Sequence, residues 1–372
     1  MGLFPRMTRK TRWAVPAGAL AITGAAMAAA LIPVAQAAPA LPARTPAQLL
    51  ADVAARSQVP AFSGTVTEST SLGLPQLPGA QQNPTSITSL LTGSHTIQVW
   101  YAGPREFRVA FPGKMSETDL YRNGDTAWLW QSVPDTVTKF TLPDKAPTTS
   151  MPDTKLPLTP QQAADDALAA VGPTTTVGVD SNVSVAGRAA YELTLAPKDA
   201  RSLIGQVRIA IDASNSVPLR VEVVARHASS PAITIGFTSV TFAAPATSDI
   251  TFTPPPGAKI TTDTPSGDHS GHNNGDVTPI GSGWLTVLKA PATALTSPAG
   301  AGAANAPVSV NGGPGAEQAA IAAFLGSATE VHGAFGTGQL IKTTLVNVLI
   351  VNGTMYLGAV EPSVLYAAAA QH

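Results

Sequence analysis

The sequence predicts a mainly β protein of the α+β class, built on a large antiparallel sheet with one apolar face. Roughly ten segments alternate apolar with polar residues, which is typical of strands that are buried on one side and wet on the other. Before residue 260, helical periodicity is convincing in only two segments. Charged residues make up 12% of the chain, about half of their usual share, and the many glycines and prolines suit short strands and turns.

The first 37 residues have the pattern of a signal peptide. Basic residues between Arg6 and Arg12 precede an uncharged Ala-rich stretch, and the small residues Ala35 and Ala37 suit a signal peptidase. The alternative is a retained membrane anchor, because the stretch is just long enough to cross a bilayer. Its internal glycines and prolines weaken that alternative. We therefore expect an exported protein of the cell envelope or the extracellular space that begins at Ala38.

Cysteine is absent, so the chain has neither disulfides nor the lipid-modified cysteine of a bacterial lipoprotein. The leader holds four of the 22 basic residues and none of the 23 acidic ones, which leaves a net charge of −5 without it. Nucleic acid is therefore not an expected partner.

The first mature element is a short helix, for which Thr45 is the N-cap and Pro46 the first helical residue. A strand begins at Phe62, and a hairpin of segments 95–101 and 107–111 follows. The next hairpin, 120–122 with 127–130, turns at Asn123-Gly124, for which we predict a type I′ turn with two positive φ angles. A further short strand covers roughly 137–142.

A second helix is predicted from the N-cap Thr159 to Val171, where Gly172-Pro173 ends it. Alternation then predicts five strands, at 183–185, 191–195, 207–211, 219–223 and 233–237. With only two helices to cover it, this sheet either closes as a barrel or curls around the helices as an open sheet.

Periodicity is lost between Thr261 and Pro279, and we interpret this stretch as a linker. A second unit follows, with a strand at 284–288, an Ala-rich helix at 316–325, a hairpin turning at Asn352-Gly353 and a last helix from Pro362. The expected organisation is a signal peptide 1–37, a large domain 38–260, a linker 261–279 and a small C-terminal domain 280–372.

Three blocks of sequence resemble the LolA/LolB/LppX superfamily of lipoprotein and lipid carriers, in its actinobacterial branch. They are 185–195 (VAGRAAYELTL), 211–219 (IDASNSVPL) and 252–257 (FTPPPG), and 62–66 (FSGTV) fits the same pattern. The resemblance covers residues 45 to 258. The unit after Gly283-Trp284 is similar to the second domain of the RseB/MucB regulators. The latch arginine of the Gram-negative carriers cannot be assigned to any arginine here.

The resemblance implies a half-open antiparallel barrel with a helical lid, a small C-terminal α/β unit, and an apolar cavity that receives acyl chains. Strand alternation supplies the candidate cavity lining: Phe62, Val66, Ile97, Val99, Phe107, Val109, Tyr191, Leu193, Ile209 and Ile211. The two helices supply the candidate lid: Leu49, Leu50, Val53, Leu168 and Val171. For any one of these residues, the alternative is a place in a packed core. Trp128 and Trp130 share a face, which is either a rim or an outer patch.

Enzymatic function is not expected, because the sequence has no nucleophile elbow, zinc-protease, dinucleotide or phosphate-loop motif. A serine-histidine-aspartate triad assembles in space and is not excluded by sequence. His269 and His272 stand among Asp263, Asp268 and Asp276, which is an ordinary ligand set for a metal. A Gly-, Ser- and Asn-rich linker offers nothing to orient the two rings, so we expect no metal site and no cofactor.

The sequence therefore predicts an extracytoplasmic carrier for a lipid or an acylated lipoprotein. The competing hypothesis is a lipid-sensing regulator whose C-terminal unit docks a membrane protein such as an anti-sigma factor.

Overall fold

The computed structural model describes residues 39–55, 58–73, 92–113, 115–142, 159–161, 164, 168, 172–263, 277–292 and 325–371. The expected signal peptide lies outside these residues, as does the expected Ala-rich helix 316–325 except for Leu325. Of the expected helix 159–171, the described positions 160, 161, 164 and 168 are helical. None of the described helices is long and apolar enough to cross a membrane.

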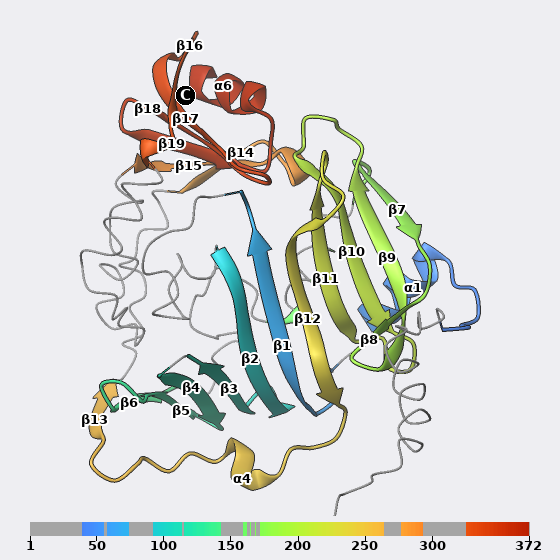
Figure 1. The fold of residues 1–372 in the computed structure, drawn as a ribbon, viewed down its shortest axis with the longest axis vertical. Helices are drawn as coiled ribbons and strands as arrows, with labels where there is room; N and C mark the ends of the chain where they lie inside the picture. Colours follow the sequence, from blue (N-terminus) through green and yellow to red (C-terminus); the bar gives the residue numbers. More distant parts are fainter. Residues whose placement is uncertain are drawn as a thin grey trace, which may run out of the picture. The chain divides into compact units, whose positions relative to one another are not determined.

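A sheet of 13 strands dominates the fold (Figure 1). Its order is β13-β6-β5-β4-β3-β2-β1-β12-β11-β10-β9-β7, with β8 paired to β9. The strands are β1 (Phe62–Ser71), β2 (Thr92–Gly103), β3 (Glu106–Pro112), β4 (Glu117–Asn123), β5 (Thr126–Gln131), β6 (Thr136–Thr141), β7 (Thr175–Val179), β8 (Val183–Val185), β9 (Arg188–Pro197), β10 (Ile204–Asp212), β11 (Pro218–Ala225), β12 (Pro231–Thr241) and β13 (Lys259–Asp263).

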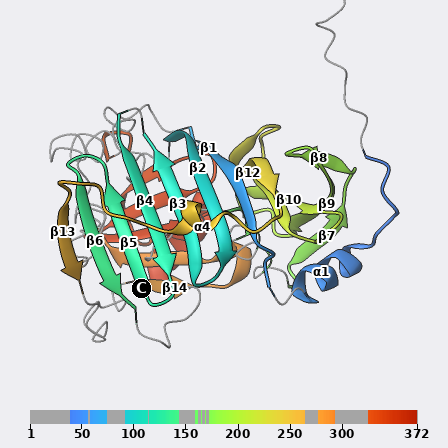
Figure 2. The ribbon, with the colours of Figure 1, turned by 90° about the horizontal axis from the view of Figure 1, so that it is seen from below.

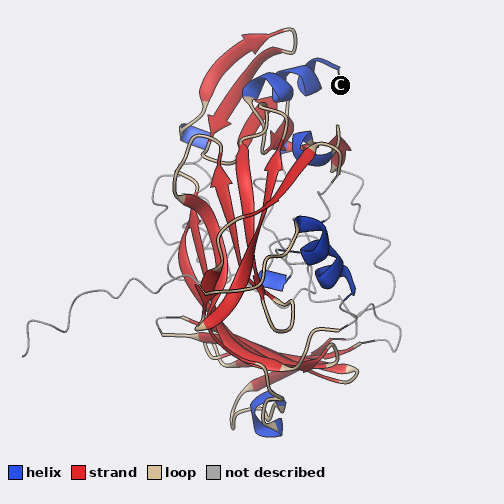
Figure 3. Cartoon of the chain, turned by 90° about the vertical axis from the view of Figure 1, so that its right-hand side faces the viewer, coloured by secondary structure: helices blue, strands red, loops and turns tan. Residues whose placement is uncertain are grey.

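The large sheet is antiparallel except at one edge, where β13 runs parallel to β6. Its two terminal strands among the described residues, β13 and β7, do not pair with each other, so the sheet is open. Figure 3 shows strands of this sheet curving rather than lying flat. The fold is thus a half-open antiparallel barrel, and the closed barrel is excluded.

Local chemistry explains where the first helix begins. α1 (Pro46–Ala55) starts with a reciprocal pair of hydrogen bonds, from the Gln48 backbone N–H to Thr45 Oγ1 at 3.3 Å and from the Thr45 N–H to Gln48 Oε1 at 2.9 Å. This capping box satisfies two N–H groups that the helix leaves open. The predicted N-cap is confirmed, and α1 packs against β7.

The predicted type I′ turn at Asn123-Gly124 is wrong. Asn123 is the last residue of β4 and pairs with Thr126, so the loop is Gly124-Asp125, in which only Gly124 has a positive φ angle, of 61°. Glycine at the first loop position with positive φ is the pattern of a type II′ turn. At the later hairpin the predicted turn at Asn352-Gly353 is confirmed, and there both residues have positive φ angles, of 49° and 77°.

A second sheet has six strands in the order β14-β15-β19-β18-β17-β16, and helix α6 (Pro362–Gln371) packs on it. Its strands are β14 (Thr278–Ile280), β15 (Val287–Pro291), β16 (Thr329–Gly333), β17 (Gly336–Lys342), β18 (Asn347–Val351) and β19 (Thr354–Gly358). The strand predicted from Trp284 begins later, because 283–285 form a 3₁₀ turn (η3, Gly283–Leu285).

Backbone hydrogen bonds join the two sheets. The N–H of Leu203 donates to Ala359 O at 2.9 Å, and the N–H of Glu361 donates to Arg201 O at 2.7 Å. The two ends of the expected linker are strand residues, in β13 and β14, and 264–276 lie outside the described residues. The domain boundaries remain a prediction.

Candidate functional site

The ten predicted lining residues share one face of the large sheet, which we call the apolar face. All ten are buried and belong to a single hydrophobic cluster. Pairing across the strands shows how they meet: Val66 lies opposite Phe237, while Ile235, Val221, Ile209 and Leu193 form a continuous row. Burial on a shared face is common to a packed core and to the wall of a lipid cavity, so their cavity role stays a prediction.

The apolar face is layered by residue type. One cross-strand row runs Phe62, Tyr101, Phe107, Arg122, Ala127 and Phe140. The next row is aliphatic at its centre: Val99, Val109, Leu120 and Leu129. The aromatic end is tightly packed, since the ring centroids of Phe62 lie 5.5 Å from those of both Tyr101 and Phe237. Such aromatic pairs stabilise the fold by more than the burial of their surface area alone.

The predicted lid residues lie against the same face as far as they are described. Leu49 and Val53 of α1 are buried within the cluster, and Leu50 and Leu168 are partly buried and pack against it. Val171 lies outside the described residues. The lid role of α1 stays a prediction.

Two ionisable residues on the apolar face escaped prediction from the sequence. Glu68 is buried on β1, where it accepts a 2.8 Å hydrogen bond from Thr70 and lies opposite His95. Burial raises the pKa of Glu68, and the Thr70 hydrogen bond and the nearby His95 oppose this in part. Arg122 on β4 is the second. Glu68 is two residues from Val66, and Arg122 is two residues from Leu120, so each lies on the same face of its strand as a buried apolar residue. This two-residue spacing was the signal in the sequence that could have identified them.

The outer face of β2, β3 and β4 is covered by residues 246–258, which we call the strap. It contains the short helix α4 (Thr247–Ile250) and crosses these strands in Figure 2. Phe252 of the strap stacks on the outer face, with its ring centroid 4.8 Å from that of Tyr121 and 5.6 Å from that of Trp128. Arg108, on this face as its parity predicts, is therefore not a freely solvated residue.

A charged cluster lies beneath the strap. Asp119 is 0% exposed, and its Oδ2 accepts hydrogen bonds from Arg108 Nε at 3.0 Å, Arg108 Nη2 at 2.6 Å and the Tyr121 hydroxyl at 3.1 Å. The guanidinium of Arg108 also lies 4.5 Å from the ring centroid of Trp100. Burial raises the pKa of Asp119 to about 6, against the opposing influence of Arg108.

Trp128 and Trp130 occupy the outer face of β5. Trp128 is held between Phe252 and Lys139, whose Nζ lies 5.2 Å from the indole centroid. The Nε1 of Trp130 donates to Asp135 Oδ1 at 3.2 Å. Of the two predicted alternatives, an outer patch describes them, and the strap partly covers it.

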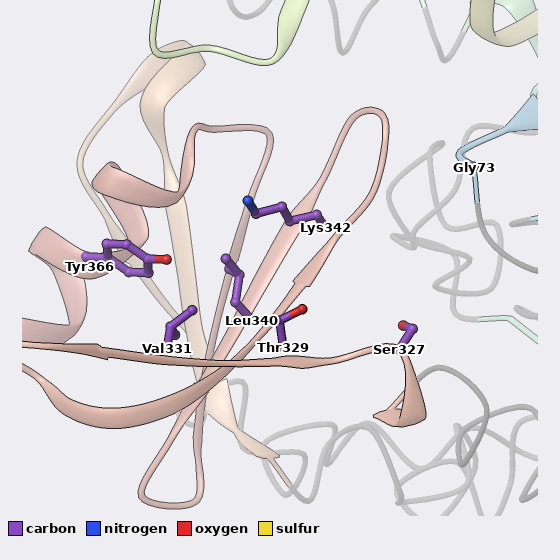
Figure 4. A pocket seen from close by; sticks show the side chains of 7 residues that line it. All are labelled: Gly73, Ser327, Thr329, Val331, Leu340, Lys342 and Tyr366. Carbon is purple, nitrogen blue, oxygen red and sulfur yellow. The ribbon is translucent and has the colours of Figure 1, made fainter.

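A cavity of about 250 Å³ lies beside the second sheet (Figure 4). Its lining comes from β16, β17, α6 and the segments after β1 and before β16: Gly73, Ser327, Thr329, Val331, Leu340, Lys342 and Tyr366. The described residues contain no cluster of three or more His, Cys, Asp or Glu side chains suited to a metal ion. His269 and His272 lie outside those residues.

No protein-family model matches the sequence, and no curated protein matches it. Among solved structures, the chain is similar to the MucA/MucB complex of Pseudomonas aeruginosa, with 13% identity, coverage of 87% of this chain and 96% of that one, and a TM-score of 0.42. A LolA superfamily protein from Nitrosomonas europaea matches with 13% identity over 56% of this chain and 99% of that one, with a TM-score of 0.20. An uncharacterised conserved protein from Thermus thermophilus matches with 11% identity over 58% and 98%, with a TM-score of 0.32.

Proposed function

We propose that this protein is an exported binding protein that holds the acyl chains of a lipid or an acylated lipoprotein against the apolar face of its large sheet. The observation that carries the proposal is the extent of that face, where the row of Ile235, Val221, Ile209 and Leu193 holds no charged residue and ends on β1 at Glu68, the register partner of Ile235. The sheet is open, and Leu49 and Val53 of the amphipathic helix α1 pack into the cluster of this face.

Burial of the chain supplies the affinity. Each CH₂ group transferred from water contributes about 0.8 kcal/mol, so a sixteen-carbon chain gains about 12 kcal/mol before the costs of binding. The entropy lost on association has a similar magnitude. Burial of the hydrocarbon can therefore offset the entropy of binding without a polar contact, and no covalent chemistry is required.

A second candidate is a regulator that senses lipid on the apolar face and docks a membrane protein, such as an anti-sigma factor, through its second unit. The favouring observation is β16, a terminal strand of the second sheet whose side chains are mostly exposed. An open strand edge is suited to pairing with an extended segment of a partner. Membrane pulldowns separate the two functions, since a regulator recovers one integral membrane protein and a carrier recovers lipoproteins or free lipid.

The acyl-binding proposal is tested with adjacent residues of β2. Ile97 is on the apolar face and 1% exposed, whereas Thr96 is exposed on the outer face. Native mass spectrometry of the purified protein, before and after organic extraction, measures bound lipid. Ile97→Asp should remove that lipid, because an unpaired carboxylate cannot remain in an apolar site. Thr96→Asp places the same charge on the outer face and should retain it.

Thermal melts of both variants separate loss of the ligand from loss of the fold. If Ile97→Asp does not fold, Ile97→Ala replaces it. Ile97→Ala should bind less lipid than the wild-type protein, and Thr96→Asp should bind as much as the wild-type protein. A wild-type protein that carries no acyl ligand and takes none up contradicts the proposal, as does a folded Ile97→Asp variant with undiminished lipid.

A further inference from the structure

Arg122 is the one cation in the aromatic row of the apolar face. It is 4% exposed, and its register partners on either side, Phe107 and Ala127, are both buried members of the hydrophobic cluster. Arginine is almost never this buried unless a counter-charge accompanies it. Its position therefore requires an explanation beyond packing.

The described residues supply only part of that counter-charge, through the nearby Asp125. Arg122 makes one hydrogen bond with them, from Nε to Gly124 O at 3.3 Å, and forms no ion pair with any described carboxylate. The nearby Asp125 is already paired with Arg105, which is itself a neighbouring cation. The group of Arg105, Asp125 and Arg122 carries a net positive charge. Desolvation and the proximity of Arg105 lower the pKa of Arg122, and Asp125 opposes this only in part, as expected of a cation without sufficient compensation.

Arg122 also lies at a rim. It is followed by the exposed Asn123 and by the Gly124 turn, so the residue stands at the end of β4. The row of Arg122 meets β1 at Phe62, six positions before Glu68, which is a distance of roughly 20 Å at the rise of an extended strand. The apolar face is therefore cationic at one end and acidic at the other.

We propose that Arg122 binds the anionic head group of the acyl ligand, a carboxylate or a phosphate, while the hydrocarbon lies along the aliphatic rows toward Glu68. This inference rests on the proposed acyl-binding function and adds the orientation and charge of the ligand. A planar guanidinium is suited to an oxyanion because it donates two parallel hydrogen bonds. Glu68 at the opposite end repels an anion, so only one orientation brings opposite charges together.

The test compares two ligands that differ only in the charged group, palmitoyl lysophosphatidate and monopalmitoylglycerol. Delipidated full-length mature protein is titrated with each, and native mass spectrometry reports the bound fraction. A charge-assisted hydrogen-bond pair favours the phosphate, so the wild-type protein should bind lysophosphatidate about 10- to 100-fold more tightly. Arg122→Met should lower this preference to about 3-fold or less and leave the affinity for monopalmitoylglycerol nearly unchanged.

Arg208→Met is the matched control, because Arg208 is a part-exposed arginine of the outer face that pairs with Glu222. It should keep the wild-type preference. Inorganic phosphate is the third ligand. If it binds as tightly as lysophosphatidate, Arg122 belongs to a site for a free anion, and the proposal is overturned. The proposal is also overturned if the wild-type protein binds both lipids equally, a measurement that needs no variant. Failure to bind either lipid would instead contradict the acyl-binding function itself.

Discussion

The guanidinium group of Arg108 donates two hydrogen bonds to a single carboxylate oxygen of Asp119, and the other oxygen, Oδ1, has no partner within the part of the chain that the structure describes. This one-sided ion pair lies beneath the strap, where water is excluded from Asp119. A carboxylate held in this way is expensive to ionise, because desolvation penalises its charged form.

The stability of the protein should therefore depend on the protonation of Asp119. Burial raises its pKa from the ordinary 3.8 to about 6, so between these values the folded state holds a proton that the unfolded state has lost. The free energy of unfolding then falls as pH rises through this window, by up to about 3 kcal/mol. Urea unfolding of the wild-type protein and of Asp119→Asn at pH 4, 5, 6 and 7 measures this pH dependence of the free energy of unfolding.

Asp119→Asn cannot ionise, so its stability relative to the wild type should improve from pH 4 to pH 7. The ion pair with Arg108 forms only when Asp119 is charged, so its contribution is already part of this titration. If the wild-type protein instead gains stability over the variant as pH rises, Arg108 keeps the carboxylate charged and the assignment is wrong.

The strap should be held to the outer face mainly by Phe252. Phe252→Ala removes the ring that contacts Tyr121 and Trp128, and should lower the free energy of unfolding by about 1–3 kcal/mol, less than for a fully buried phenylalanine. Exposure of Trp128 should also shift the tryptophan emission to longer wavelength. Thr253→Ala changes an exposed neighbour and should do neither; equal effects of the two variants would mean that the strap acts through its backbone.

Gly64 should be intolerant of a side chain. A Cβ atom there would lie 2.6 Å from Ser239 O and 3.1 Å from the Phe237 ring, beside the bulge at Thr65/Val66. Gly64→Ala should therefore destabilise the protein by about 1–3 kcal/mol, as overpacking does in other cores. The matched control is Gly103→Ala, where no heavy atom lies within 4 Å of the added Cβ. Chemical denaturation measures both, and an unaffected Gly64→Ala would show that β12 yields to the methyl group.

Strand alternation predicted the apolar face well because the side-chain period of a strand is two, whatever the strand pairs with. Phe107 and Val109 were assigned to the buried side from this rule alone, and the structure places them there. The same rule applied to polar residues would have placed Arg122 and Glu68 on that side too. They were missed because the prediction considered only the apolar residues at alternate strand positions and not the polar residues at the same positions.

Other features could not be read from local sequence. β13 pairs in parallel with β6, and their partners Thr138 and Thr261 are 123 residues apart. The strap is similarly remote from the strands that it covers. Neither contact has a local period, and a Pro-rich segment such as 252–257 predicts a loop without indicating the surface on which it lies.

The sequence by itself determined which residues of each strand turn inward and where α1 begins, because these depend on neighbours only a few residues away. Only the tertiary structure decided that the outer face is covered as well, so that Asp119 is buried there, and that Arg122 is surrounded by apolar residues. The physical reason is that burial is a property of what packs on a residue, and in this protein the covering segments come from distant parts of the chain.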